Sequence, residues 1–322
     1  MRQKNWLWLA LTFLVACGLL LGVIGKAKTQ QVPDPNFDAT VAHPTYINTH
    51  PKVLFDEAHL NFHTSAGGYK PFVELITNDG YQVTPNTKKF QTKTLANYDI
   101  LVIANALGTK EGQLAFTNSE CDAVRNWVYK GGSLLLIADH APFGAAAENL
   151  SMRFGVQMSK EFTIDISHYD SDSGNPGWLL FTRENKLLAD HPITQGRNAS
   201  DRINRVLTFT GQSLKVPDKS TAFLRLADTA RDLKQRISKA QMLPSNAGVS
   251  AAGKAQGIAL HFGKGRVVLL GEAGMLSAQL ITGQAAQQLM GKDVIQMGMN
   301  YPGFDNRQLA LNIMYWLSKL LR

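Results

Sequence analysis

The sequence predicts an α/β domain with an open, mostly parallel β-sheet. Short apolar runs with the length of buried strands alternate with segments in which apolar residues recur at helical spacing. Such alternation at short separation requires right-handed βαβ units, which build a parallel sheet. The composition, with 44% hydrophobic and 18% charged residues in 322, is that of an ordinary globular protein.

The first half of the domain contains the clearest strands and helices. Its short, mostly apolar strands are typical of a parallel sheet buried on both faces. They are expected at residues 52–57, 81–83, 98–105 and 133–139. The helices are expected at residues 69–79, ending at Asp79-Gly80, and 118–129, with Asn118 or Ser119 as its N-terminal cap and Gly131-Gly132 at its end.

Residues 158–255 are less regular and are expected to form a long insertion in the domain. Two strands are predicted within it, at residues 206–211 and 221–226. Residues 228–253 are polar and are predicted to form an exposed excursion. The segment Asp170–Asn175 has part of a calcium-loop pattern but lacks its third acidic position and distal Glu, so a solvated turn is expected.

Regular structure is predicted again after the insertion. Residues 256–261 and 266–271 form a predicted hairpin, joined by a Gly-Lys-Gly turn. The chain closes with a helix at residues 306–321, whose apolar face consists of Leu309, Ile313, Leu317 and Leu320. We therefore expect one domain over residues 51–322.

The N-terminus predicts a membrane association. Residues 6–24 are uncharged and apolar, close to the roughly 20 residues that a membrane-spanning helix needs. We predict an uncleaved signal-anchor in residues 1–25 and a polar tether at 26–50, with the domain on the extracytoplasmic side. Cleavage near residues 25–27 would instead release a soluble exported protein. A third alternative is a lipoprotein, because Leu14-Val15-Ala16-Cys17 resembles a bacterial lipobox.

The charge and cysteine content exclude several classes of protein. The net charge of +8 comes from 33 Lys and Arg against 25 Asp and Glu, and the basic residues are scattered. Scattered excess charge is typical of a solvated surface, and no nucleic-acid-binding motif is present, so no nucleic-acid partner is expected. Only Cys17 and Cys121 are present, so the domain can hold neither an internal disulfide nor a CxxC metal site.

Acidic and histidine residues concentrate where the predicted strands end. In open parallel sheets, ligands bind beyond the carboxyl ends of the strands. The first strand is followed by Asp56, Glu57, His59 and His63, the third by Asn105, the fourth by Asp139 and His140, and the late strand by Glu272. We expect these groups to converge on one ligand.

The residue types suggest a role for each group. Asp139, His140 and Glu272 are the candidate catalytic residues, as acid–base groups or metal ligands. Asp56, Glu57 and Asn105 are candidates for substrate binding. His59 and His63, four residues apart, are candidate ligands of a divalent metal such as Zn²⁺ or Mn²⁺, with Fe also compatible. Asp56 and Asp139 have an alternative, purely structural role, as caps of the helices that follow their strands.

The pattern resembles the class I glutamine amidotransferase-like superfamily, in the branch that contains ThuA-like and GldG-like domains. The segments that carry the resemblance are VLFDEAH (53–59), YDILVIAN (98–105), WVYKGGSLLLIADHAPFG (127–144), HPITQG (191–196), GRVVLLGEAGM (265–275) and NIMYWL (312–317). The resemblance implies a flavodoxin-like three-layer fold.

The resemblance fails at one functional position. Members of the superfamily hydrolyse glutamine with a Cys at the sharp turn after a central strand. Here that turn is Asp139-His140-Ala141-Pro142, and Cys121 lies at the start of the preceding helix. Glutaminase activity is therefore not expected, and the fold alone does not determine the function.

Two functions remain open from the sequence. The first is a hydrolase, metal-assisted or using Glu272 or His140 as general base. The second is a non-catalytic envelope module that binds a glycan, a peptide or a partner protein. In that case Trp178 and Tyr169 of the insertion would be available to stack on a sugar.

Overall fold

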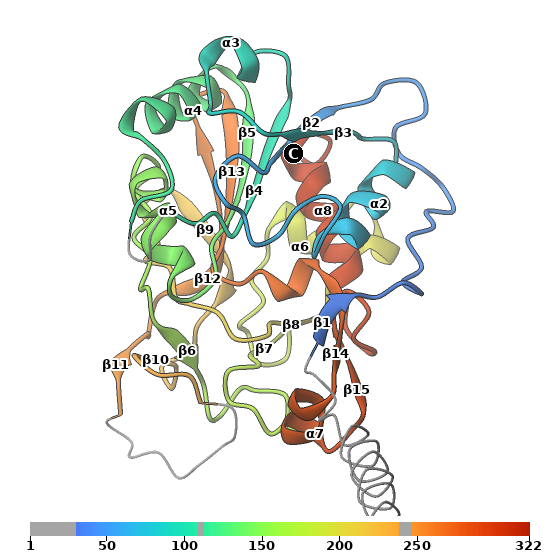
Figure 1. Cartoon of the computed structure of the whole chain (residues 1–322), viewed down its shortest axis with the longest axis vertical. Coiled ribbons are helices and arrows are strands. Elements are labelled where there is room, and N and C mark those ends of the chain that lie inside the picture. Colours follow the sequence, from blue (N-terminus) through green and yellow to red (C-terminus); the bar gives the residue numbers. More distant parts are fainter. Residues whose placement is uncertain (1–29, 109–112, 238–246) are drawn as a thin grey trace, which may run out of the picture.

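The structure of this chain is a computed structural model that describes residues 30–108, 113–237 and 247–322 (Figure 1). Its centre is a seven-stranded sheet. The strands, in spatial order, are β3 (Gln82–Asn86), β2 (Lys52–Asp56), β4 (Ile100–Ala104), β5 (Ser133–Ile137), β13 (Gly265–Leu270), β12 (Ala255–Phe262) and β9 (Ser220–Arg225).

The strand order confirms the predicted fold class. The first five strands of the sheet pair in parallel. Among these five strands, β3 is the second along the chain and lies at the edge, beside the first, β2. Strands β4, β5 and β13 follow in sequence, which gives the 2-1-3-4-5 order of flavodoxin-like folds. Strand β12 runs antiparallel to both β13 and β9, so the predicted hairpin is present. The fold is mixed α/β with a mainly parallel sheet.

Helices cover both faces of the sheet and make the three layers (Figure 1). Side chains of a strand alternate between its two faces. In β4, Ile100, Val102 and Ala104 join the core on one face, and Leu101 and Ile103 join the core on the other. The first face is covered by α2 (Lys70–Asn78), α6 (Pro192–Gln195) and α8 (Asn306–Leu317), and the second by α3 (Thr92–Leu95), α4 (Asn118–Lys130) and α5 (Phe143–Met152).

Two helix predictions require correction. Helix α4 is capped by Thr117, not by Asn118 or Ser119, because Thr117 and Glu120 form a reciprocal capping box. Helix α8 does not have a single apolar face. Every residue from 309 to 317 is buried, while Leu320, which was assigned to that face, lies beyond the helix and is 41% exposed. A helix that is apolar all round packs within the core, here against α2, α6 and the sheet.

The insertion is more ordered than predicted. It contains β6 (Phe162–Ile164), β7 (Leu180–Thr182), β8 (Arg205–Leu207), β10 (Arg231–Leu233) and β11 (Val249–Ser250), besides β9 and the short helices α6 and η1 (Ala199–Asp201). The expectation of an exposed excursion at 228–253 is right only in part: β11 and the segments beside β10 are exposed, but β10 pairs with β6 and β11 and is partly buried. Asp232 is 2% exposed there and accepts hydrogen bonds from Thr163, Ser213 and Lys254.

A second sheet, not predicted from the sequence, lies at the lower end of the molecule in Figure 1. Its strands are β1 (Gln30–Pro33), β14 (Ala278–Thr282) and β15 (Val294–Gly298), all antiparallel. Helix α7 (Gln284–Met290) connects β14 to β15, and the short helix η2 (Gly274–Leu276) connects β13 to β14. This small sheet faces the carboxyl ends of the main strands, since its residues line the cavity described below.

The membrane prediction has to be corrected. No helix within the described ranges is long and apolar enough to cross a membrane. The membrane-anchored chain with an extracytoplasmic domain is therefore not carried further. The apolar run at 6–24, Cys17 and the alternative cleavage site near 25–27 lie outside the described residues.

Candidate functional site

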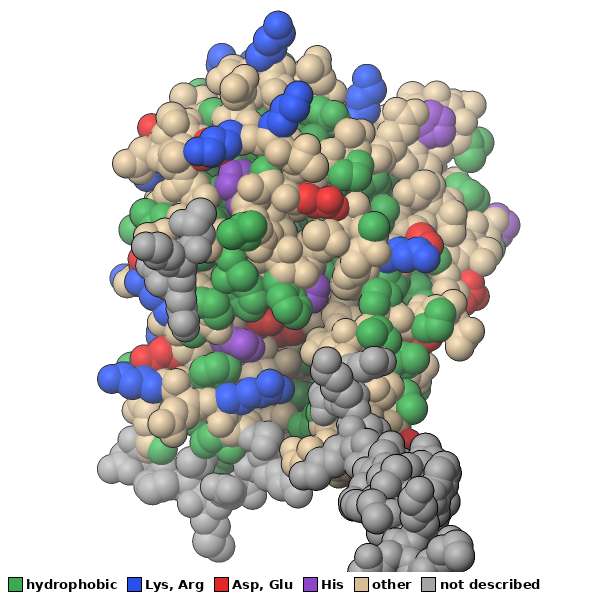
Figure 2. Space-filling view, in the orientation of Figure 1, with side chains coloured by type: hydrophobic (Ala, Val, Ile, Leu, Met, Phe, Trp, Pro, Cys, Tyr) green, Lys and Arg blue, Asp and Glu red, His purple; other side chains and the backbone are tan. Residues whose placement is uncertain are grey.

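A cavity of about 250 Å³ lies at the carboxyl ends of β4, β5 and β13. The small sheet and α7 form its opposite wall, and Phe62, Phe143, Trp178 and Phe209 contribute aromatic surface. Five residues predicted from strand ends line it: His63, Asn105, Asp139, His140 and Glu272. Figure 2 shows acidic and histidine side chains together in a hollow on one face of the molecule, framed by hydrophobic ones.

Asp139 follows β5 and is held from both sides. Its backbone N–H donates to the Asn105 side-chain oxygen at 2.9 Å, and its Oδ1 accepts the His140 backbone N–H at 2.8 Å. Asn105 has a left-handed φ of 51°, which Asn tolerates better than most residues. The side chain of Gln212 donates to the carbonyl oxygens of Ala138 and Asp139, at 2.8 and 2.9 Å. The Asp139 carboxyl is thereby fixed at the cavity wall, 14% exposed.

Glu272 follows β13, the neighbour of β5 in the sheet. It is 1% exposed, and its two carboxyl oxygens accept the backbone N–H groups of Gly274 and Met275, the second at 2.7 Å. These residues begin η2, so the carboxyl group is held by the turn that follows its strand. Two acidic side chains from adjacent strands therefore line the same small cavity.

Burial makes both carboxyl groups harder to ionise than an exposed carboxyl. Burial raises the pKa of Asp139 to about 6, although the charges of His140 and Arg236 lower it in part. Burial, and then the charge of Asp139, raise the pKa of Glu272 well above its usual range, against the effect of its backbone hydrogen bonds. Both shifts favour retention of a proton by the carboxyl groups, and more strongly on Glu272 than on Asp139.

His140 lies beside this pair at the more exposed side of the cavity. Its Nδ1 lies 2.7 Å from the Ala141 carbonyl oxygen. A carbonyl oxygen only accepts, so Nδ1 carries the proton and donates it. Nε2 then faces Asp139, 3.9 Å from its Oδ1. The ring packs on Phe162 at 4.4 Å, and the side chain is 22% exposed.

His63 enters the cavity from the loop after β2. The Phe62 backbone N–H donates to the Asn105 carbonyl oxygen at 2.9 Å, which ties this loop to the end of β4. The His63 ring packs on Tyr69 at 4.7 Å and the side chain is buried. Burial lowers the pKa of His63 to about 4, so the ring is neutral at neutral pH.

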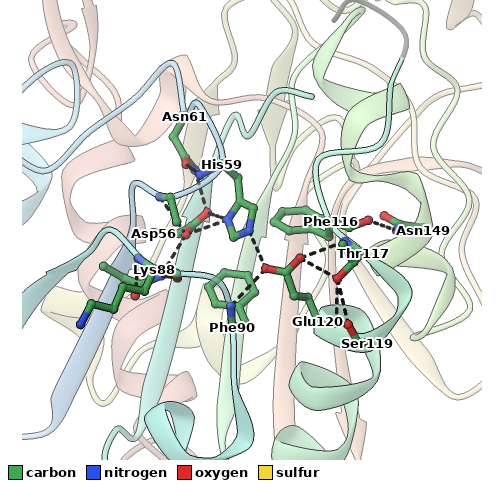
Figure 3. Close-up of polar contacts among 12 residues, drawn as sticks. Asp56, His59, Asn61, Lys88, Phe90, Phe116, Thr117, Ser119, Glu120 and Asn149 are labelled. Carbon is green, nitrogen blue, oxygen red and sulfur yellow. Dashed lines mark hydrogen bonds and ion pairs between the residues drawn. The ribbon is translucent and has the colours of Figure 1, made fainter. Parts of the chain in front are cut away.

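Asp56 and His59 do not line the cavity but form a separate buried cluster with Glu120 (Figure 3). His59 Nδ1 lies 2.8 Å from Asp56 Oδ2, and its Nε2 lies 2.9 Å from Glu120 Oε1. Carboxylate oxygens only accept hydrogen bonds, so both ring nitrogens carry protons and the ring is an imidazolium. Burial alone would lower the pKa of His59, but the two carboxylates outweigh it and raise that pKa.

This cluster fills the place where a flavodoxin-like fold usually opens. The strand order reverses between β2 and β4, and ligands of such sheets bind outside that switch point. Here the His59 ring lies between Phe90 and Phe116, each 4.7 Å away, and Asn61 and Asn86 donate to Asp56. The switch point is therefore closed by a buried salt bridge, and the cavity opens farther along the sheet, toward β13.

Glu57 also lies outside the cavity. Its Oε1 accepts the backbone N–H and the hydroxyl of Ser65, at 2.7 and 2.6 Å. The carboxylate thus fastens the loop that carries His63, and the substrate-binding role predicted for Glu57 has no support in this geometry.

The predicted metal ligands do not fit a metal site. Both nitrogens of His59 face carboxylates, and His63 Nδ1 faces Gly68, where an added Cβ would lie 2.4 Å from it. No group of three or more His, Cys, Asp and Glu residues in the described ranges is arranged to hold a metal ion.

Several contributors to the site were not identified from the sequence. Glu120 has a sequence signal, the Thr-x-x-Glu pattern of a capping box. Gln279 on β14 and Arg236 after β10 also line the cavity, and no pattern pointed to them because the strands or loops that carry them are short and polar. Cys121 is no candidate nucleophile, since burial raises its pKa to about 11.

The stacking role expected for Trp178 finds little support, because little of its ring is accessible even though it lines the cavity. Its side chain is 1% exposed and packs edge-on against Phe209 and Tyr301, 4.9 and 5.9 Å away. Tyr169 lines a different, more open cleft of about 770 Å³, beside Asp170 and Tyr301. That cleft contains none of the strand-end residues predicted for the site.

The similarity of this chain to known proteins concerns the fold. No family model matches the chain, and no curated protein matches it. Among solved structures, the N-terminal domain of mmIFT52 has a TM-score of 0.56 and 13% identity, over 83% of this chain and 97% of that one.

Other solved neighbours are more distant. A ThuA-like protein from Bacteroides uniformis ATCC 8492 has a TM-score of 0.42 and 12% identity, over 86% of this chain and 93% of that one. Cytoplasmic protein STM3548 from Salmonella typhimurium has a TM-score of 0.43 and 12% identity, over 83% and 98%. The neighbours thus include ThuA-like proteins, and at these identities the likeness concerns the fold alone.

Proposed function

We propose that this protein is a hydrolase in which Asp139 and Glu272 act on a small uncharged substrate. One observation supports the proposal: two carboxyl groups from adjacent strands line one cavity, and burial raises the pKa of both, with the charge of Asp139 raising that of Glu272 further. Carboxyl groups whose pKa values are driven apart in this way are typical of acid–base catalysis.

Each group has a distinct role in the proposed reaction. Asp139 is ionised and serves as the base that takes a proton from a water molecule. Glu272 is protonated and serves as the acid that donates to the leaving group. His140, with Nε2 facing Asp139 and a partly exposed ring, exchanges protons with solvent. A positioned acid or base contributes about 10²- to 10⁴-fold to such a rate.

We further infer that the chain is a branch of the class I glutamine amidotransferase-like superfamily that has lost thiol chemistry. The flavodoxin-like strand order and the ThuA-like neighbours support the relationship. The position of the nucleophilic Cys is taken by the Asp139–Pro142 turn, and Cys121 lies on the buried side of α4. The carboxyl pair stands in the same part of the fold.

The test is hydrolysis of small chromogenic substrates. The full chain would be assayed on p-nitrophenyl esters, anilides and glycosides, together with Asp139→Asn and Glu272→Gln. Asp190→Asn, an exposed aspartate outside the cavity, is the matched control. We expect turnover by wild type and control, and a loss of at least about 100-fold in both site variants. Absence of turnover in the wild type, or an unchanged rate in Asp139→Asn, would overturn the proposal.

A non-catalytic binding function is favoured by the hydrogen bonds that Glu272 accepts. Both oxygens of Glu272 accept backbone N–H groups, as they would if this carboxyl only capped η2. In that case the protein is a non-catalytic module that binds a glycan, a peptide or a partner protein. Binding on a glycan or peptide array that survives Asp139→Asn, without turnover of any ligand, would support this alternative.

A further inference from the structure

Two buried side chains in the cavity have polar atoms without a partner in the protein. Gln279 is 2% exposed, and its side-chain Nε2 has no hydrogen-bond acceptor. His63 is 4% exposed, and its Nδ1 has no partner either. Both residues line the cavity that contains Asp139 and Glu272. Buried polar groups are rarely left unpaired, so unpaired ones at a cavity wall point to a ligand.

The geometry of His63 determines which atom serves the ligand. A neutral imidazole carries one N–H. Nδ1 is enclosed against Gly68, and a proton there would be a buried donor with no acceptor. The proton is therefore assigned to Nε2. His63 and Gln279, which both line the cavity, thus each have an N–H group for which no acceptor is present in the protein.

We infer that His63 and Gln279 bind the carbonyl oxygen of an uncharged acyl compound, an ester or an amide. The inference rests on the proposed function and names its substrate class. Two N–H donors that line one cavity suit an oxygen that only accepts, as a carbonyl oxygen does. An uncharged acyl compound fits best, because the cavity already contains Asp139 and the oppositely charged Arg236.

The rest of the cavity suits the remainder of such a compound. Phe62 and Phe143 lie 5.8 Å apart, and Phe62 is 61% exposed, so an apolar surface borders the polar groups. A volume of about 250 Å³ limits the ligand to a small acyl group with a small leaving group. Apolar contacts on one side and a few placed polar groups on the other are typical of small-molecule sites.

The hydrolysis balances with the groups present. A water oxygen bonds to the carbonyl carbon while Asp139 takes a proton from that water. The carbonyl oxygen becomes an oxyanion, held by the His63 and Gln279 N–H groups. When the carbonyl re-forms, the bond to the leaving oxygen or nitrogen breaks with its electron pair, and Glu272 supplies the proton. The products are a carboxylic acid and an alcohol or amine, and transfer of the proton from Asp139 to Glu272 restores the pair.

The first test measures binding, independently of turnover. In the ¹⁵N-labelled full chain, we expect the His63 ring to be neutral with its proton on Nε2 between pH 6 and 8. Addition of N-methylacetamide should shift the His63 Nε2 resonance in a saturable manner, and the same concentration of ethane-1,2-diol should not. A proton on Nδ1, or no response to the amide in the wild type, overturns the inference.

The second test measures the role of the two donors in catalysis, with p-nitrophenyl acetate. Gln279→Leu and His63→Phe each remove one donor, and we expect kcat to fall about 100-fold with little change in KM. His63→Gln retains an N–H near the Nε2 position and should recover most of the loss. Gln296→Leu, an exposed glutamine of β15, is the control. Unchanged kcat in His63→Phe, with correct folding, contradicts the donor role.

The two tests separate this inference from the proposed function. If N-methylacetamide binds at His63 but no ester or amide is turned over, the carbonyl site stands and the hydrolase proposal fails. If esters are turned over in a manner that depends on Asp139 while Gln279→Leu and His63→Phe behave as wild type, the hydrolase stands and the carbonyl site fails.

Discussion

Replacing Asp139 by Asn should make the protein more stable, although it removes the base of the proposed hydrolysis. The Asp139 carboxyl is buried in the cavity wall, and its pKa rises from the ordinary 3.8 to about 6. A carboxyl that is harder to ionise in the folded state than in the unfolded state favours unfolding once the pH allows ionisation. Asn has nearly the same shape and retains the oxygen that accepts the His140 backbone N–H.

The expected gain follows from the two pKa values. Each pKa unit corresponds to about 1.36 kcal/mol, so a rise from 3.8 to about 6 corresponds to about 3 kcal/mol above pH 6. The side chain is only 14% exposed, so solvent screening reduces this value little. Between pH 3.8 and 6 the folded wild type holds more protons than the unfolded chain, and its stability falls as the pH rises. The variant has no such loss.

The assay is denaturant unfolding of both chains across a pH series. We expect Asp139→Asn to exceed the wild type by about 1 kcal/mol at pH 4.5 and about 3 kcal/mol at pH 7. The control is Asp232→Asn, a buried aspartate whose Oδ2 pairs with Lys254 Nζ at 2.7 Å. Asn at that position loses the ion pair and an acceptor, so the control should be less stable than the wild type.

Two results would refute the reasoning about Asp139. One is an Asp139→Asn variant that is equal to or less stable than the wild type at pH 7. The other is a stability difference that does not change between pH 4.5 and 7, because a gain from cavity packing alone would not depend on pH. A higher free energy of unfolding together with a loss of activity would show that the ionisable Asp139 serves the site at the expense of stability.

Three further predictions concern other parts of the chain. His59→Gln leaves both carboxylates, Asp56 and Glu120, without their charged partner, and we expect a loss of about 3–5 kcal/mol in denaturant unfolding at pH 6. The loss should narrow as the pH rises through the raised pKa of His59, since the wild type then loses its imidazolium; a constant difference would contradict the cluster's charge state. Arg236→Ala removes a charge that lowers the pKa of Asp139, so the ¹³C-detected titration of that carboxyl should move above pH 6, and a downward shift would be inconsistent with the site. Cys121→Ala should retain the hydrolytic rate, and the native thiol should resist iodoacetamide at pH 8 because its pKa is about 11; rapid alkylation of the folded chain would show otherwise.

The main sheet was predictable because burial on both faces restricts its central strands to apolar residues. Strands β4 and β5 are buried on both faces, so they read as continuous apolar runs in the sequence. Strands β14 and β15 have mixed polar and apolar residues, and their antiparallel pairing depends on a partner, β1, that is distant in the chain. Local patterns do not contain that information, so the wall that closes the cavity was missed.

The sequence predicted the residues that strand order brings together. It did not predict contacts between side chains that are distant in the sequence. Asp139 and Glu272 follow strands that are neighbours in the sheet, so their convergence follows from the strand order. Asp56 and His59 also follow a strand, yet Glu120, which is 61 residues from His59, meets them and closes the switch point. The sequence indicates the capping box of α4, which includes Glu120. It does not indicate that Glu120 also forms an ion pair with His59.

By itself the sequence determined the α/β class, the parallel strands and the set of polar groups at one edge of the sheet, because burial and strand period act on neighbouring residues. Only the tertiary structure decided which of those groups share a cavity. A salt bridge is formed where His59 meets Glu120, and the carboxyl pKa values rise where Asp139 and Glu272 are both desolvated. Both depend on distances across the fold and on exclusion of water, which no local pattern encodes.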